Sequence, residues 1–88
     1  MRKLDISRDA YKFIDGLQAK QYRQVVRKLM SLLVDPQPHD AAQLRGNDYW
    51  RADIGEYRII YKFGDETVIV YLVGLRNDDA IYKHLGRL

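Results

Sequence analysis

Three arginines and one tyrosine in the C-terminal half of the sequence are the residues best suited to chemistry on a phosphate. Arg51 and Arg58 lie in two segments that alternate with a period of two, Arg76 follows a third such segment, and Tyr82 comes six residues later. Guanidinium groups stay protonated near neutral pH and cannot neutralise one another, whereas their planar fork fits a phosphate. If the segments pair in order, we expect the four side chains to converge at one end of a sheet around a shared anion.

An alternative interpretation is that these arginines form ordinary surface ion pairs, which are mostly solvated and contribute little. Three acidic residues lie close to them in the sequence, namely Glu56, Asp78 and Asp79. A further acid, Asp53, shares a strand face with Arg51, because side chains alternate along a strand. Asp53 has two candidate roles, a base that accepts a proton and a partner of Arg51 or Arg58. Pairing is the favoured one.

The alternating segments predict the strands that would position these side chains. Period-two alternation between short turn sequences is typical of β-strands. Gly55-Glu56 and Gly64-Asp65 are connections of hairpin length, so we expect consecutive antiparallel strands. The expected strands are Tyr49–Ile54, Tyr57–Phe63 and Thr67–Leu75.

The N-terminal half has helical periodicity after a short first strand, Arg2–Ile6. Ser7 is expected to cap a helix that ends near Gly16, because its hydroxyl can accept a hydrogen bond from a free amide of the first turn. A second, longer helix is expected to end at Asp35-Pro36, since proline cannot continue a helix. Its apolar stripe consists of Tyr22, Val25, Val26, Leu29, Leu32 and Leu33.

The last segment predicts a short helix that would carry the tyrosine. Asn77 or Asp78 is expected to cap it, and it would run through His84 or Leu85 and end at Gly86. The resulting order, β-α-α-β-β-β-α, predicts a single α+β domain over residues 1–88. Its antiparallel sheet would be packed against helices on one face.

Positive charge is concentrated in the N-terminal half. The chain has 15 Lys and Arg against 12 Asp and Glu, and its net charge is +3. Residues 1–40 hold eight cations and five acids, whereas residues 41–88 hold seven of each. The second helix carries four cations on its polar side and no acid: Lys20, Arg23, Arg27 and Lys28. A solvated face is the ordinary interpretation, and contact with nucleic-acid phosphates is the alternative.

Several classes of function are disfavoured by the composition. The chain has no cysteine, which excludes disulfides and thiolate metal sites. His39 and His84 lack metal-ligand spacing, Ser7 and Ser31 have no triad partners in view, and no glycine-rich phosphate loop occurs. No signal peptide or membrane span is expected, so a cytoplasmic location is predicted. Neither a metal nor a cofactor is expected.

Four stretches of the sequence resemble the RelE/ParE toxin superfamily. They are Leu44-Arg45-Gly46, the run Tyr49–Tyr61, Val73-Gly74-Leu75-Arg76 and Ile81-Tyr82. The long run is similar to the family pattern R-x-R-v-G-d-Y-R-v-i-Y, and the order of helices and turns also agrees. The resemblance therefore covers nearly the whole chain. The superfamily contains mRNA-cleaving toxins and gyrase poisons on one fold, so the fold alone does not decide between them.

The resemblance to RelE-type members implies a ribosome-dependent, metal-free endoribonuclease. Such an enzyme cleaves mRNA in the ribosomal A site by attack of a 2′-hydroxyl on the adjacent phosphate. The implied catalytic residues are Arg51, Arg58, Arg76 and Tyr82. The residues expected to contact ribosomal RNA or mRNA are Lys20, Arg23, Arg27, Lys28, Arg45 and Lys83. The implied partners are the ribosome, mRNA and an acidic, RelB-like cognate antitoxin, without a membrane.

Asp53 departs from the RelE pattern, which carries a second basic residue at its position. The departure leaves the general base of the implied reaction open. It also motivates a second hypothesis, a gyrase-poisoning or catalytically silent binder on the same fold. A third hypothesis is an interaction domain whose cations only decorate the surface.

Overall fold

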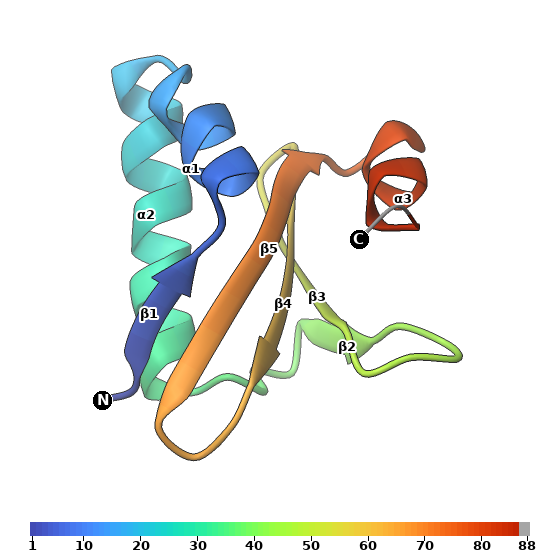
Figure 1. The fold of residues 1–88 in the computed structure, drawn as a ribbon. Helices are drawn as coiled ribbons and strands as arrows, with labels where there is room; N and C mark the ends of the chain where they lie inside the picture. The colour runs from blue at the N-terminus through green and yellow to red at the C-terminus, as the bar shows by residue number, and fades with distance from the viewer. Residues whose placement is uncertain (87–88) are drawn as a thin grey trace.

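Five strands form one sheet, with α1 and α2 on one face and α3 on the other (Figure 1). The computed structural model describes residues 1–86. The elements are β1 (Lys3–Ile6), α1 (Arg8–Asp15), α2 (Ala19–Val34), β2 (Ala41–Gln43), β3 (Trp50–Ile54), β4 (Tyr57–Phe63), β5 (Thr67–Leu75) and α3 (Ala80–Leu85). The α+β class and the predicted β-α-α-β-β-β-α elements are confirmed, and β2 is an addition to them.

The strand order of the sheet is β1-β5-β4-β3-β2. The predicted meander of β3, β4 and β5 is confirmed, because each pairs antiparallel with the next. The sheet as a whole is mixed rather than antiparallel, since β1 pairs parallel with β5 after the crossover through α1 and α2. Strand β2 is not indicated by the sequence. It is only three residues long, too short for alternation to reveal it, and it pairs with β3 at the edge.

The start of α1 agrees with the sequence. The Ser7 hydroxyl accepts a hydrogen bond from the Ala10 amide at 3.1 Å, which satisfies one free donor of the first turn. The same hydroxyl donates to the Tyr71 carbonyl of β5 at 2.6 Å. Ser7 therefore both caps α1 and ties its N-terminus to the sheet. Gly16 ends the helix as expected.

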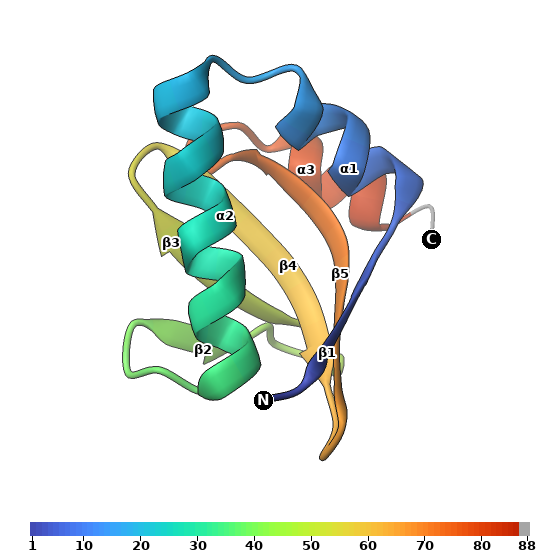
Figure 2. The same ribbon diagram turned by 90° about the vertical axis from the view of Figure 1, so that its left-hand side faces the viewer.

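Helix α2 lies across the sheet and supplies much of the main core (Figure 2). Four residues of its predicted stripe are buried: Val25, Leu29, Leu32 and Leu33. Val26 is half-buried, and Tyr22 is an exception because it is 43% exposed. The helix ends at Val34 before Asp35-Pro36. The buried hydroxyl of Tyr61 then donates to the Pro36 carbonyl at 2.6 Å, which anchors the chain as it leaves the helix.

The expectation that all helices cover one face is wrong for α3. Ile60 and Leu72 face away from the main core, and Ile81 of α3 covers them in a second, smaller cluster. Side chains alternate along β4 and β5, and around Ile60 and Leu72 they are apolar on both faces of the sheet. Both faces must therefore be shielded from water by a helix. Gly74 permits the close approach, since a Cβ there would lie 3.3 Å from the Ile81 side chain. Among residues 1–86, no helix is long and apolar enough to cross a membrane.

Candidate functional site

The β3–β4 hairpin brings Asp53 directly opposite Arg58. The two residues are register partners in the antiparallel ladder, and Arg51 is the partner of Ile60. Ile60 belongs to the cluster under α3, so these polar side chains lie on the α3 face of the sheet. Gly55, with a φ of 56°, adopts the left-handed conformation that this tight turn needs. Arg51, Asp53 and Arg58 are therefore placed by strand pairing.

Arg58 is the centre of the cluster. Its Nε donates to Oδ1 of Asp53 at 2.7 Å, and its Nη2 donates to Oδ2 at 3.0 Å. This is the bidentate fork that guanidinium groups form with carboxylates. Its third nitrogen, Nη1, donates to the hydroxyl of Tyr82 on α3. Arg58 thus links β3, β4 and α3 at one point.

The Asp53 carboxylate is held ionised by this arrangement. The hydrogen bonds from Arg58 lower the pKa of Asp53 below its usual value, and the charges of Arg51 and Arg76 lower it further. Burial opposes them by raising the pKa, but its effect is smaller. The same pair, with the Tyr82 hydroxyl, raises the pKa of Arg58. A carboxylate with a lowered pKa is a weak proton acceptor. The geometry therefore favours the pairing role of Asp53 over the base role.

Arg51 and Arg76 are held less tightly than Arg58. Nη1 of Arg51 lies 3.6 Å from Oδ2 of Asp53, which is an ion pair without a hydrogen bond, and the Arg51 side chain is 34% exposed. Arg76 is exposed just after β5, where its backbone amide donates to the Glu56 carbonyl at 2.9 Å. The structure thus brings Arg51 and Arg58 together at Asp53, and Tyr82 joins them through Arg58. The charge of Arg76 also lowers the pKa of Asp53, but no contact links the Arg76 side chain to this group among the described residues. In the described part of the chain, the ion pairs of these arginines are with Asp53 and not with the three acids suggested by sequence proximity.

A pocket of about 410 Å³ adjoins Tyr82, and the sequence motifs do not predict it. It lies between the loop before β3 and α3, and it is lined by Leu44, Arg45, Asn47, Tyr49, Tyr82, Leu85 and Gly86. On the same face of the sheet, Nζ of Lys62 lies 4.4 Å from the centroid of the Tyr49 ring. Strand alternation in the sequence could have indicated this surface, because it places Tyr49 and Lys62 on the same sheet face as Arg51 and Arg58.

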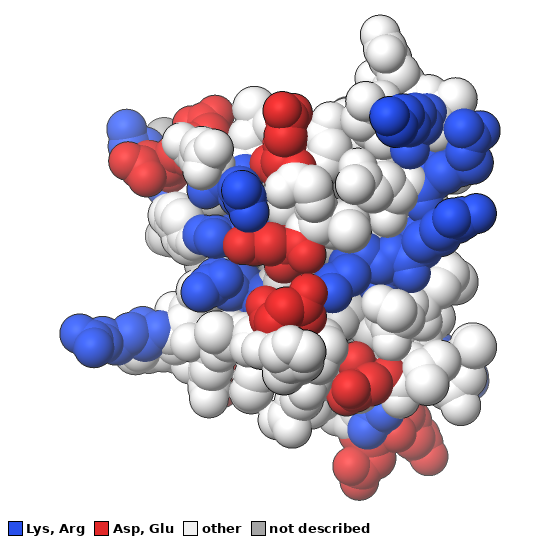
Figure 3. Space-filling model, turned by 180° about the vertical axis from the view of Figure 1, so that it is seen from behind, with Lys and Arg blue, Asp and Glu red and all other residues white. Residues whose placement is uncertain are grey.

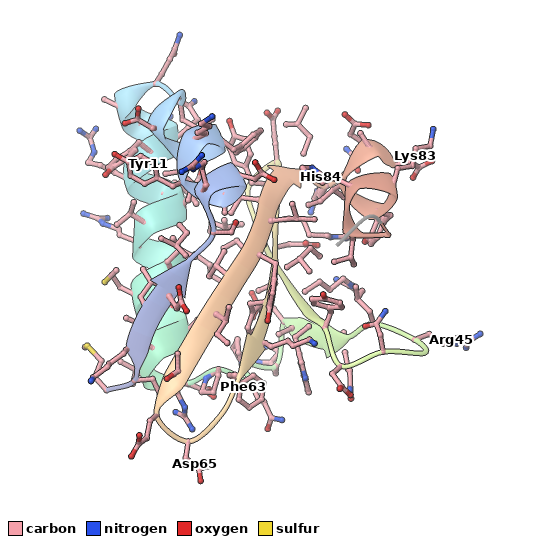
Figure 4. All side chains as sticks on the ribbon, viewed as in Figure 1. Tyr11, Arg45, Phe63, Asp65, Lys83 and His84 are labelled. Carbon is pink, nitrogen blue, oxygen red and sulfur yellow. The ribbon has the colours of Figure 1, made fainter. Side chains whose placement is uncertain are left out.

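The predicted basic face of α2 lies away from this cluster. Together with Ile54, its residues line a groove of about 470 Å³: Lys20, Arg23, Gln24, Arg27, Lys28 and Ser31. Figure 3 shows Lys and Arg gathered on the side that α2 occupies. Lys28 differs from the other cations, since its ammonium is paired with Asp40 at 2.7 Å and its side chain is only 13% exposed. The remaining predicted contacts, Arg45 and Lys83, point outward from the β2–β3 loop and from α3 (Figure 4).

Comparison with known proteins decides the family. The model of the ParE toxin of type II toxin–antitoxin systems, parDE, matches residues 4–80. The chain belongs to this toxin family. A search of curated proteins found no match. The protein is accordingly a toxin of a type II toxin–antitoxin module on the RelE/ParE fold, which confirms the resemblance seen in its sequence.

Solved structures of RelE proteins share the fold of this ParE-family toxin. A mutant of the E. coli toxin RelE in the free state has a TM-score of 0.79 and 26% identity, covering 99% of this chain and 97% of that chain. The intact E. coli RelBE toxin–antitoxin complex matches with a TM-score of 0.73 and 29% identity, covering 85% of this chain and 96% of that chain. The archaeal RelE–RelB complex from Pyrococcus horikoshii OT3 matches with a TM-score of 0.73 and 25% identity, covering 85% of this chain and 94% of that chain.

Proposed function

We propose that this toxin is a ribosome-dependent endoribonuclease that cleaves mRNA in the A site without a metal ion. The observation that supports the proposal is the contact between Arg58 and Tyr82, with Arg51 on the same sheet face and Arg76 just after β5. Cleavage of RNA by its own 2′-hydroxyl needs positive charge around one phosphate and a group that can transfer a proton. This cluster offers both.

The proposed reaction forms a bond between the 2′-oxygen and phosphorus and breaks the bond between phosphorus and the 5′-oxygen. Negative charge grows on the non-bridging oxygens, where Arg51 and Arg76 would stabilise it, each by about 3 kcal/mol if they act as oxyanion-hole donors do. The hydroxyl of Tyr82 is the group proposed to give a proton to the departing 5′-oxygen. The proton of the attacking 2′-hydroxyl passes to solvent water, and the Tyr82 phenolate then regains a proton from solvent. The products are a cyclic phosphate and a 5′-hydroxyl.

The ribosome would supply the geometry that the toxin alone does not. Holding mRNA in a near-attack conformation lowers the barrier without a strong acid or base. The exposed cations of α2, together with Arg45 and Lys83, are proposed to contact ribosomal RNA or mRNA through phosphates. The protein would then act in the cytoplasm. A RelB-like acidic antitoxin is the proposed partner that neutralises it, since related toxins were solved in complexes with RelB antitoxins.

Substitution of Arg76 tests the proposal. The toxin and the Arg76→Ala variant are expressed in cells, and new mRNA 5′ ends are mapped against the codon positions. We expect the parent toxin to arrest translation and produce cuts within codons, and Arg76→Ala to lose both while keeping its circular dichroism spectrum. Arg8→Ala, which removes an exposed arginine from α1, is the matched control and should behave as the parent. A parent toxin that arrests growth without new mRNA ends contradicts the proposal.

A second candidate function is gyrase poisoning or silent binding on the same fold. Two observations favour it, the match to the ParE family model and the neutralisation of Arg58 by Asp53. Its signature is accumulated DNA breaks without new mRNA ends. The same expression experiment therefore separates the two functions when chromosomal breaks are measured in parallel.

A further inference from the structure

We propose that Asp53 is a positioning residue that keeps Arg58 away from phosphate and directs it to the Tyr82 hydroxyl. The inference rests on the proposed RNA-cleaving function and assigns different tasks to the three arginines. Arg51 and Arg76 bind the RNA phosphate, whereas Arg58 holds and polarises Tyr82.

Both edges of Arg58 that could take a phosphate are engaged: Asp53 occupies the edge formed by Nε and Nη2, and on the edge formed by Nη1 and Nη2 the Nη1 group donates to Tyr82. A guanidinium binds oxyanions best through two parallel N–H groups on one edge. In Arg58, Nε and Nη2 donate to the two oxygens of Asp53 at 2.7 and 3.0 Å. The Arg58 side chain is also only 16% exposed. A phosphate would have to displace the carboxylate from a half-buried position to reach this edge.

The remaining nitrogen of Arg58 is directed at the site. With Nε and Nη2 bound to Asp53, the planar group is fixed in orientation, and Nη1 meets the Tyr82 hydroxyl. Strand pairing supports this orientation, because Asp53 and Arg58 are direct register partners across a short turn. A fixed donor at the phenol oxygen stabilises negative charge there when Tyr82 releases its proton.

Arg51 and Arg76 are the cations that remain for the substrate. Arg51 has a single ion-pair contact with Asp53 at 3.6 Å, and Arg76 is exposed. Neither side chain takes part in the two hydrogen bonds of the Asp53–Arg58 fork.

Removing the charge of Asp53 should therefore move binding and cleavage in opposite directions. In Asp53→Asn the fork is broken, and Arg58 becomes free to contact a phosphate. One added contact with single-stranded RNA steepens the slope of log affinity against log salt by about 0.7. Cleavage should fall by about tenfold or more, because Tyr82 no longer has its fixed partner. An ion pair that only stabilises the fold would not raise the salt slope.

The experiment measures both quantities on purified full-length toxin. Binding of a single-stranded RNA oligonucleotide is followed by fluorescence anisotropy at several salt concentrations, and cleavage is followed in single-turnover reactions with programmed ribosomes. Asp65→Asn is the matched control, since it removes one exposed carboxylate at the β4–β5 turn (Figure 4), at the opposite end of β4 from Arg58. In Asp53→Asn/Arg58→Ala the slope should return to that of Arg58→Ala.

The outcomes separate this inference from the proposed function. A slope in Asp53→Asn equal to that in Asp65→Asn overturns the inference, whatever happens to cleavage. A parent toxin that does not cleave removes the proposed function, while a steeper slope in Asp53→Asn still supports the holding of Arg58 by Asp53. If Asp53→Asn does not fold, NMR of the parent toxin decides. The Nε–H signal of Arg58 should then stay in place on RNA addition while those of Arg51 and Arg76 shift, and a shift of Arg58 overturns the inference.

Discussion

At the scale of single residues, Asp53 is the acid that the two arginines of the β3–β4 hairpin share. The same carboxylate contacts Arg58 through two hydrogen bonds and Arg51 through an ion pair. Because its partners are charged and half-buried, the loss of one partner leaves an uncompensated charge. Asp53 therefore links the stability of the hairpin to the electrostatics of the site.

The pH dependence of stability should report this pairing. The pKa of Asp53 is lowered in the folded protein, so its contribution is present above the pKa of the unfolded chain and is lost as the pH falls through the folded value. At neutral pH, Asp53→Asn should lower the free energy of unfolding by about 1–3 kcal/mol. The difference between the two proteins should shrink as the pH falls below the pKa of an unfolded aspartate and through the lowered pKa of Asp53, as followed by urea denaturation.

Asp40 provides the comparison for that experiment. Its pKa is also lowered by Lys28, but the Asp40 side chain is 50% exposed, so solvent weakens the pair. Asp40→Asn should cost less stability than Asp53→Asn at neutral pH. An equal cost for both variants, or a constant difference across the pH range, would argue against a special role for the Asp53 pair.

At the scale of elements, short helices and hairpins are held by a few contacts at their ends. Helix α3 has six residues, and its attachments are Ile81 in the smaller core, the Arg58–Tyr82 contact and a 3.1 Å pair between His84 and Asp9 of α1. Asp78 supports its start by accepting from the Ala80 amide at 2.9 Å. The position of Tyr82 therefore depends on tertiary contacts, because a helix this short is not stable alone.

The cap of α1 is a second place where one side chain joins two elements. Ser7→Ala removes the cap and the hydrogen bond to the Tyr71 carbonyl, so the free energy of unfolding should fall by about 1–2 kcal/mol. Ser31→Ala is the control, since its exposed hydroxyl only donates to the Lys28 carbonyl within α2. Chemical denaturation should show a change within about 0.5 kcal/mol for the control. Equal losses for both serines would contradict the capping role.

At the scale of the whole molecule, the two faces of the sheet have different tasks. The face under α1 and α2 contains the main core, whereas the face under α3 carries the polar cluster. The outer surface of α2 adds a basic groove on the opposite side of the sheet from the cluster. A ribosome-bound toxin could therefore hold ribosomal RNA with one surface and present the other to mRNA.

Substitutions in the groove should weaken ribosome binding without changing the chemistry. For Arg23→Ala/Arg27→Ala, log affinity for ribosomes should depend less steeply on log salt, by about 0.7–0.9 for each phosphate that the variant no longer binds. Cleavage at saturating ribosomes should stay near the parent rate. Lys28→Ala should have a smaller effect, because Asp40 already neutralises Lys28. Ribosome co-sedimentation at several salt concentrations measures the affinity and its salt dependence. Unchanged binding in the double variant would show that the groove does not bind the ribosome.

The sequence by itself determined most of the local structure and the family. Ser7, Pro36 and the turn glycines mark boundaries through interactions within a few residues, and alternation correctly assigned the three meander strands. The run from Tyr49 to Tyr61 correctly indicated the toxin fold. Strand β2 and the side covered by α3 were beyond these signals, since both depend on segments far apart in the chain.

Only the tertiary structure decided how the candidate residues are used. Alternation placed Arg51 and Asp53 on one strand face, but it could not select the partner of Arg58 from the nearby acids. That choice depends on the register of β3 and β4, which puts Asp53 at hydrogen-bonding distance. The contact with Tyr82 depends further on α3 crossing to the opposite face of the sheet. Hydrogen bonds are made over about 3 Å, so side chains on separate elements meet only when the packing of the whole fold brings them together.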